Sequence, residues 1–266
     1  MASGRTSQGG FFGVAVLLFA VAAGLTIALC ASMADMGGMP MPGGWTMSMA
    51  WMRMPGQTWP AAAVSFLGMW DLMMVAMMLP SLVPMLWRYR RSIPRTGGTR
   101  LGGLTALVGA GYFVVWTVFG LLAFPLGAGL AAAEMRLPVV ARAVPFVTGG
   151  IVLAAGALQF TAWKARHLAC CRKAPGGCCP MPGDAGTAWR HGLSLGLHCG
   201  CCCSGLMAIL LAVGVMDLRI MALVTAAITV ERLAPAGEYV ARGIGAVVIG
   251  AGLFLVAMAG GLAPPG

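Results

Sequence analysis

Long apolar stretches recur along the chain, and short segments rich in basic and turn-forming residues separate them. A helix needs about twenty apolar residues to cross roughly 30 Å of hydrocarbon. Seven stretches follow this pattern, the sixth being short: Phe11 to Met33, Ala61 to Leu86, Leu101 to Ala133, Ala143 to Trp163, Ser194 to Val215, Ile220 to Val230 and Gly243 to Leu262. None alternates with period two, as strands of a membrane barrel do. The pattern predicts an all-α, polytopic transmembrane helix bundle of about seven spans.

The expected organisation is a single transmembrane helical domain over residues 11–262, preceded by a short N-terminal segment, 1–10. Two connecting segments differ from the rest in composition, a Met-rich loop over 34–60 and a Cys-rich loop over 164–190. The first span follows Arg5 as the apolar core of a signal peptide would, but the residues after it match a cleavage site poorly. We therefore predict that it is retained as a span.

Composition excludes a soluble globule, because 59% of the residues are hydrophobic, only 9% are charged, and the mean hydropathy is +0.88. The net charge of +10 is concentrated in short segments beside the spans, which suits membrane insertion and lipid headgroups rather than nucleic acid. Thirteen basic residues fall on one predicted side: Arg5, Arg88, Arg90, Arg91, Arg95, Arg100, Lys164, Arg166, Arg172, Lys173, Arg190, Arg232 and Arg242. Four fall on the other: Arg53, Arg136, Arg142 and Arg219.

This asymmetry orients the chain in a bacterial inner membrane with the N-terminus and the Cys-rich loop cytoplasmic and the Met-rich loop and C-terminus external. Eight of the nine cysteines lie in or just after the fourth and fifth spans. On the reducing side disulfides rarely persist, so these cysteines are predicted to be thiols or metal ligands. Cys30, alone in the first span, is expected to be small core packing.

Candidate metal-ligating side chains are most concentrated in residues 191–207, HGLSLGLHCGCCCSGLM, where imidazole and thiol groups lie within an apolar span. These groups are ligands of soft metals and are rare in hydrocarbon. On a helix two histidines and two cysteines share one face, with two further cysteines on the adjoining strip; the six are His191, His198, Cys201 and Cys202, then Cys199 and Cys203. Small residues also line close helix contacts in membranes, but four cysteines in five positions favour metal or redox chemistry.

The second span, MWDLMMVAMMLP, places thioethers and a carboxylate at a similar depth. The candidates form two stripes and one acidic neighbour: Met69, Met73 and Met77, then Met74 and Met78, then Asp71. A carboxylate in an apolar helix is costly unless it is paired, protonated or metal-bound, so Asp71 is a functional candidate. For the methionines alone, flexible helix packing is the favoured interpretation. Together with the fifth span they predict a shared midplane site.

Two further groups lie near the membrane surfaces. At the end of the fourth span His167, Cys170 and Cys171 can share a helical turn, with Cys178 and Cys179 following, as metal ligands or as free or palmitoylated thiols. The external loop carries Met33, Met36, Met39, Met41, Met47, Met49, Met52 and Met54, which could collect Cu(I) or pack on the bilayer beside tryptophans. Glu231 is expected to form a salt bridge with Arg232 or to relay protons, and Gln159 is a separate candidate for a polar neighbour of the metal path.

The segments MWDLMMVAMMLPSLVP, GYFVVWTVF, QFTAWK, CGCCCSGLM with VGVMDL, and ERLAP together resemble an uncharacterised bacterial family of predicted metal-binding integral membrane proteins, over roughly Ser65 to Leu262. The resemblance implies functional positions at Met69, Trp70, Met73, Met74, Met77, Met78, Pro80, Cys199, Cys202, Cys203 and Glu231. The chain departs from the family at His167 and Cys201, where cysteine and glycine are usual, and at Ser204, where tryptophan is usual. Histidine keeps a ligand at the first of these positions.

These observations predict a protein that binds copper, as Cu(I), and moves it or hands it across the membrane, with zinc or another soft transition metal as the alternative ion. The expected partners are lipids, the ion, and a copper chaperone or membrane complex. One rival is a non-transporting copper metallochaperone or accessory subunit, and another is a membrane thiol or metal oxidoreductase. No catalytic residue is assigned, since the sequence has no recognisable nucleotide-binding loop and no flavin or haem motif.

Overall fold

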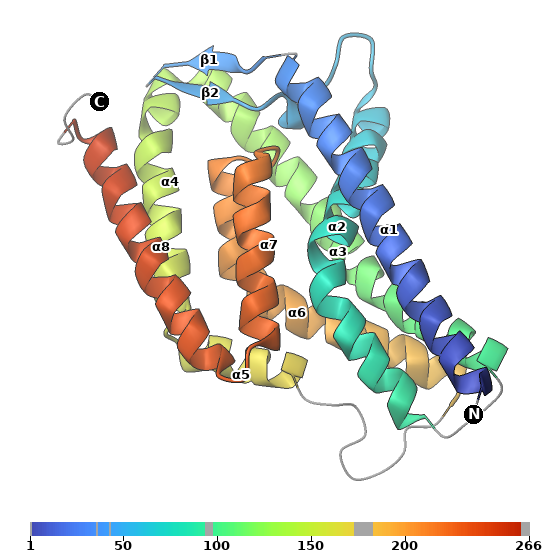
Figure 1. Cartoon of the computed structure of the whole chain (residues 1–266). Helices are drawn as coiled ribbons and strands as arrows, with labels where there is room; N and C mark the ends of the chain where they lie inside the picture. The colour runs from blue at the N-terminus through green and yellow to red at the C-terminus, as the bar shows by residue number, and fades with distance from the viewer. Residues whose placement is uncertain (1, 36, 43, 94–97, 173–182, 262–266) are drawn as a thin grey trace.

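A computed structural model describes residues 2–35, 37–42, 44–93, 98–172 and 183–261, and these form an all-α bundle with one small hairpin (Figure 1). The helices are α1 Ala2–Asp35, α2 Trp59–Ser92, α3 Gly98–Arg136, α4 Pro138–Leu158, α5 Ala162–Arg172, α6 Ala185–Val213, α7 Leu218–Leu233 and α8 Gly237–Ala259. All of these helices except α5 and α7 are long and apolar enough to cross a membrane. The predicted helical bundle is confirmed, and its short sixth span corresponds to the 16-residue α7.

Two segments differ from their predicted form. The fourth span was expected to continue to Trp163, but α4 ends at Leu158 and a separate helix, α5, occupies the first part of the predicted Cys-rich loop. The Met-rich loop contains an antiparallel hairpin, β1 Met39–Met41 with β2 Trp45–Met47, followed by a 3-10 turn, η1 Met49–Trp51. Cys178 and Cys179 lie outside the described residues.

The connections alternate between two ends of the bundle (Figure 1). The N-terminus, α5 and the α7–α8 turn lie at one end, whereas the hairpin, the α3–α4 turn and the α6–α7 turn lie at the other. This arrangement matches the grouping of loops on which the predicted orientation rests. Among those of the thirteen basic residues whose burial the structure describes, however, Lys164 and Arg232 are buried inside the bundle and are not surface charges.

Glycines bring α6 against α3. A methyl group at Gly192 would overlap the carbonyl oxygen of Val108, and one at Gly196 would lie 2.9 Å from the carbonyl oxygen of Tyr112. Small residues allow helix backbones to approach closely in membranes, where van der Waals packing rather than hydrophobic exclusion holds helices together. The result is that Tyr112 of α3 reaches the cysteine-bearing turn of α6.

Candidate metal centre

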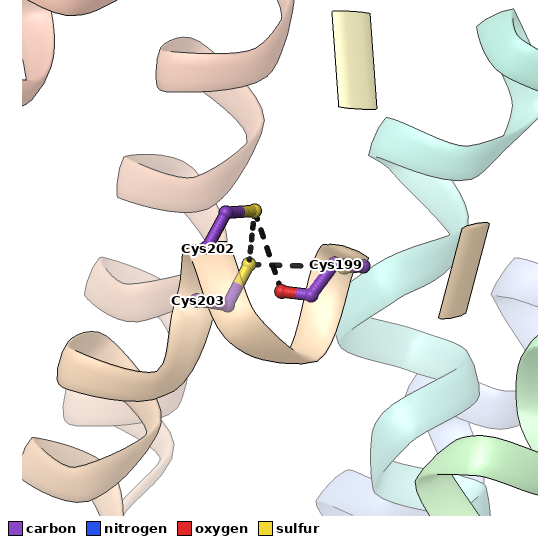
Figure 2. A group of neighbouring side chains, drawn as sticks. All are labelled: Cys199, Cys202 and Cys203. Carbon is purple, nitrogen blue, oxygen red and sulfur yellow. Dashed lines mark hydrogen bonds between the residues drawn. The ribbon is translucent and has the colours of Figure 1, made fainter. Parts of the chain in front are cut away.

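Three buried thiols come from one turn of α6. Cys199, Cys202 and Cys203 occupy positions i, i+3 and i+4, which share one face of a helix. Their side chains are 0%, 2% and 1% exposed, and their sulfur atoms all lie within 4.8 Å of one another (Figure 2). The Sγ of Cys203 is 3.7 Å from that of Cys199 and 3.6 Å from that of Cys202. We call these three residues the thiol cluster.

A fourth thiol reaches the cluster from α5. The Sγ of Cys171 is fully buried and lies 3.7 Å from the Sγ of Cys202. At the start of α5, the hydroxyl of Thr161 accepts a hydrogen bond from the Lys164 N–H. At its last residue, the Arg172 guanidinium donates to the carbonyl oxygens of Ala234 and Pro235 and so holds α5 against the segment after α7. The hydrogen bond with Cys202 and burial raise the pKa of the Cys171 thiol, which favours its protonated form at neutral pH.

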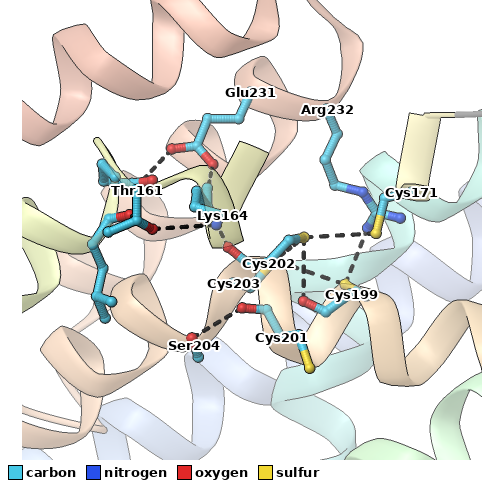
Figure 3. A network of polar contacts seen from close by, with 12 residues as sticks. Thr161, Lys164, Cys171, Cys199, Cys201, Cys202, Cys203, Ser204, Glu231 and Arg232 are labelled. Atoms are coloured by element: carbon cyan, nitrogen blue, oxygen red, sulfur yellow. Dashed lines mark hydrogen bonds and ion pairs between the residues drawn. The ribbon is translucent and has the colours of Figure 1, made fainter. Parts of the chain in front are cut away.

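A buried guanidinium lies against the thiol cluster. Nη1 of Arg232, at the end of α7, donates to the Sγ of Cys199 at 3.2 Å (Figure 3). The same nitrogen donates to the hydroxyl of Ser81 at 2.8 Å. Tyr112 contacts the same sulfur through its hydroxyl at 3.0 Å. Within the described residues, Nε and Nη2 of Arg232 are buried without a hydrogen-bond partner. Arginine stays charged in proteins, so Arg232 supplies fixed positive charge beside the sulfurs.

Beside the cluster is a buried ion pair that joins three helices. The ammonium of Lys164 is 2.6 Å from Oε2 of Glu231 and donates to the carbonyl oxygen of Cys202 at 2.5 Å (Figure 3). Gln159, just after α4, donates to Oε1 of Glu231 at 2.9 Å. The expectation that Glu231 would pair with Arg232 is therefore wrong, because consecutive helical residues point in different directions. The break between α4 and α5 lets both Gln159 and Lys164 turn toward Glu231.

The other candidates in α5 and α6 lie around the thiol cluster. The ring of His198 turns to His167, with 5.7 Å between ring centroids, and its Nδ1 lies 2.7 Å from the carbonyl oxygen of Ser194. His191 stacks on Tyr89 with centroids 5.4 Å apart. Cys170 is exposed and Cys201 is half-buried. Among the described residues, Cys199, Cys202 and Cys203 form the one group of three or more histidine, cysteine or acidic side chains close enough to share an ion.

The candidates of α2 divide between two environments. Met73, Met74, Met77 and Met78 are buried in the same core as the thiol cluster, whereas Met69 is half-buried. The carboxylate of Asp71 accepts a hydrogen bond from Thr117 of α3 at 2.9 Å. Its polar partner is therefore a hydroxyl, and the hydrogen bonds found for Asp71 in the described chain do not join it to the cysteines.

Sequence reasoning missed the partners supplied by other helices. Lys164 was counted as a surface charge, Arg232 was counted there and assigned to Glu231, and no role was given to Tyr112 or Ser81. Their signal was local: ERLAP places a glutamate and an arginine beside an apolar span, and GYFVVWTVF places a tyrosine inside one. Buried polar groups need hydrogen-bond partners, which would have indicated that such residues are paired.

The fold is a helical bundle whose long helices are apolar enough to cross a membrane. Inside it, three buried thiols lie close enough together to ligate a soft metal. A family model described as PpoB2, copper chaperone, matches residues 67–255, which is more than half of the 266 residues. The chain therefore belongs to the PpoB2 copper chaperone family. Among curated proteins and among solved structures, none matches the chain. The matched range includes the thiol cluster, Cys171 and Arg232, and this family is consistent with the metal-binding resemblance found in the sequence.

Proposed function

We propose that this protein is a membrane-embedded copper chaperone that carries Cu(I) between Cys199, Cys202 and Cys203 and hands it to a partner protein. The observation that carries the proposal is the set of three buried sulfurs on one helical turn, in a chain of a copper chaperone family. The ion is a cargo, held long enough to be transferred. The proposed setting is the bacterial inner membrane, with α5 at the cytoplasmic face.

The ligand set supports Cu(I) over zinc. Thiolates are soft ligands that select Cu(I), and three of them complete a trigonal site, whereas structural zinc sites are almost always four-coordinate. Three thiolates around a monovalent ion leave net negative charge in a buried environment, which is costly unless it is compensated. The guanidinium of Arg232, 3.2 Å from one sulfur, offsets part of that charge.

Ligand exchange offers a route for release. Cys171 is 3.7 Å from Cys202 and belongs to a different helix, so it can replace one cluster sulfur after losing its proton. Next along α5 is the exposed thiol of Cys170, and the His167 and His198 rings lie nearby. Donors spaced in this way allow an ion to move by exchange of one ligand at a time. The receiving partner would therefore dock near α5.

Movement of copper across the membrane is a second proposal, supported by the methionines of α2. Met73, Met74, Met77 and Met78 are all buried in the core that contains the thiol cluster. Thioethers bind Cu(I) weakly enough to pass it on, and a stripe of them along a helix could serve as a path. Transport and handover use the same thiol cluster and differ in whether copper crosses the bilayer.

Copper binding by purified full-length protein tests the first proposal. Under reducing conditions, Cys202→Ala and Cys203→Ala should each lose most Cu(I) binding, because removal of one sulfur leaves only two in the cluster. Cys201→Ala is the matched control, since Cys201 is on the same helical turn but outside the group of three. Equal copper content in all three variants and the wild type would show that the cluster is packing.

A further inference from the structure

A second group of sulfur atoms lines a small pocket between α1, α2 and the α6–α7 turn. The pocket is lined by Thr26, Leu29, Cys30, Met69, Met73 and Met216. Four of these residues carry sulfur, and Sγ of Cys30 lies 3.8 Å from Sδ of Met216, although the two are 186 residues apart. This sulfur pocket lies outside the thiol cluster, and its thiol comes from α1, which the family match does not cover.

Thr26, one of the residues that line the sulfur pocket, carries a buried hydroxyl. Thr26 is 6% exposed and its Oγ1 is buried without a hydrogen-bond partner in the described chain. Thr26 and Cys30 are four residues apart, so they share one face of α1. A buried hydroxyl without a partner is costly, and the great majority of buried polar groups are satisfied. The packing of α1 around Cys30 therefore leaves one polar atom unsatisfied beside the pocket.

A helix cap beside the α6–α7 turn helps to fix the position of Met216. Asp217 begins α7 by accepting hydrogen bonds from the N–H groups of Arg219 at 2.7 Å and Ile220 at 3.2 Å. Met216 is the preceding residue, so this cap limits where its side chain can reach. Met73 is fully buried on α2 and Cys30 is 4% exposed on α1. The donors thus come from three segments whose positions are set by packing.

We propose that the sulfur pocket is a second binding site for a soft monovalent metal ion, with Cys30 and Met216 as principal ligands and Met69 and Met73 as the other sulfur-bearing residues of the lining. This inference rests on the proposed function for the identity of the ion, Cu(I). A site with one thiol and several thioethers carries less negative charge than the thiol cluster and holds Cu(I) less tightly. It lies toward the end of the bundle that carries the hairpin, since α1 ends there and the α6–α7 turn lies there (Figure 1).

The position of the sulfur pocket suits a loading site. The methionines of the hairpin are divided, since Met41 and Met47 are buried against Ala131 and Ala141 whereas Met39 is exposed. Met41 and Met47 therefore contribute to packing, whereas Met39 and Met54 are exposed to the surroundings. The pocket instead presents sulfur from α1 and α2 in one place, and Met73 is also part of the core that contains the thiol cluster. In the second proposal, in which copper crosses the membrane, an ion entering at the hairpin end would reach the pocket before the thiol cluster.

The experiment uses full-length protein labelled with ¹³C at the methionine methyl groups and titrated with Ag(I), a redox-stable probe for soft monovalent sites. The background variant C199A/C202A/C203A removes the thiol cluster, and Met→Leu changes assign the resonances. We expect Ag(I) to shift the Met216, Met69 and Met73 methyl signals in both the wild type and this background. In Cys30→Ala, the Ag(I) concentration needed for half of that shift should rise by about tenfold or more. The exposed Met258 of α8 is the control signal and should not move.

Two results would overturn the sulfur pocket as a site: unshifted Met216, Met69 and Met73 signals at saturating Ag(I), or the same Ag(I) affinity in Cys30→Ala as in its parent. Met216→Leu conserves volume and provides a second test, because it should lose pocket binding without a packing defect. Failure of the proposed function is separate. It would appear as equal total Ag(I) binding in the wild type and in C199A/C202A/C203A, whatever the Met216 signal does.

Discussion

Arg232 brings a permanent charge into the interior of the bundle, where it contacts a thiol of the proposed copper site. Its Nη1 is shared between the Sγ of Cys199 and the hydroxyl of Ser81, and the residue is 2% exposed. Without a bound ion and thiolates, such a charge is expensive to bury. The positive charge of Arg232 therefore suits a thiolate site that carries net negative charge when Cu(I) is bound. We expect Arg232 to contribute more to the affinity for Cu(I) than to the folding of the copper-loaded protein.

At the residue scale, Arg232→Lys should weaken Cu(I) binding by about tenfold to hundredfold, because a hydrogen bond to a charged group contributes about 1.5–3 kcal/mol. Lysine keeps the charge, but its shorter, strongly hydrated ammonium does not reproduce the rigid guanidinium that holds Nη1 between Ser81 and Cys199. Competition with a coloured Cu(I) chelator measures the change. Arg166→Lys, on the exposed side of α5, is the control. Unchanged affinity in Arg232→Lys would mean that the guanidinium has no part in copper binding.

At the element scale, the ion pair of Lys164 and Glu231 joins α5 to α7 and, through Gln159, to the end of α4. Breaking a buried pair leaves an uncompensated charge, which costs about 3–5 kcal/mol, whereas removing both charges costs far less. Lys164→Met should therefore lower the melting temperature markedly, and Lys164→Met with Glu231→Gln should recover much of the loss. Thermal unfolding in detergent measures both. A double variant no better than the single one would contradict the pairing.

The contact between α3 and α6 also belongs to the element scale. A methyl group at Gly192 overlaps the Val108 carbonyl oxygen, so Gly192→Ala must push the helices apart and should cost about 1–3 kcal/mol. Separation would also weaken the contact between Tyr112 and Cys199 and reduce copper retention. Gly109→Ala is the matched control, because a methyl group there meets nothing within 4 Å. Equal thermal stability of the two variants would contradict close packing at Gly192.

At the scale of the whole molecule, the orientation of the bundle can be tested at one exposed thiol. Cys170 is exposed on α5, whereas Met54 is exposed at the opposite end near η1. With Cys178 and Cys179 changed to serine, an impermeant thiol reagent should label Cys170 in inverted vesicles but not in intact cells. Met54→Cys, added to a form with Cys170→Ser, should give the reverse. Labelling of Cys170 from outside intact cells would invert the orientation and place α5 at the external face.

Transport across the whole molecule is distinguished from handover by copper flux in proteoliposomes. Asp71 lies in a long apolar helix and accepts a hydrogen bond from Thr117. A carboxylate at such depth can compensate a cation in passage but is not needed by a static thiolate site. Asp71→Asn should therefore slow flux severalfold and leave equilibrium Cu(I) binding unchanged, with Asp35→Asn at the end of α1 as the control. Binding without flux in the wild type would exclude transport and leave handover.

Much of the architecture followed from the sequence because it depends on local properties. Apolar length determined the spans, since every backbone polar group in hydrocarbon must be satisfied within its own helix. Because successive spans cross in opposite directions, their order along the chain then assigned each loop to one of two ends. Spacing of three and four residues placed Cys199, Cys202 and Cys203 on one helical turn for the same local reason.

Only the tertiary structure decided which other side chains meet those residues. Cys171, Arg232 and Tyr112 reach the thiol cluster from α5, α7 and α3, and Cys30 meets Met216 across 186 positions of sequence. Neither hydrophobicity nor periodicity specifies such contacts, because they depend on where glycines allow helices to approach and on where α4 breaks before α5. Asp71 shows the same limit: its depth in the span was readable from the sequence, but its hydroxyl partner on α3 was set by how the helices pack.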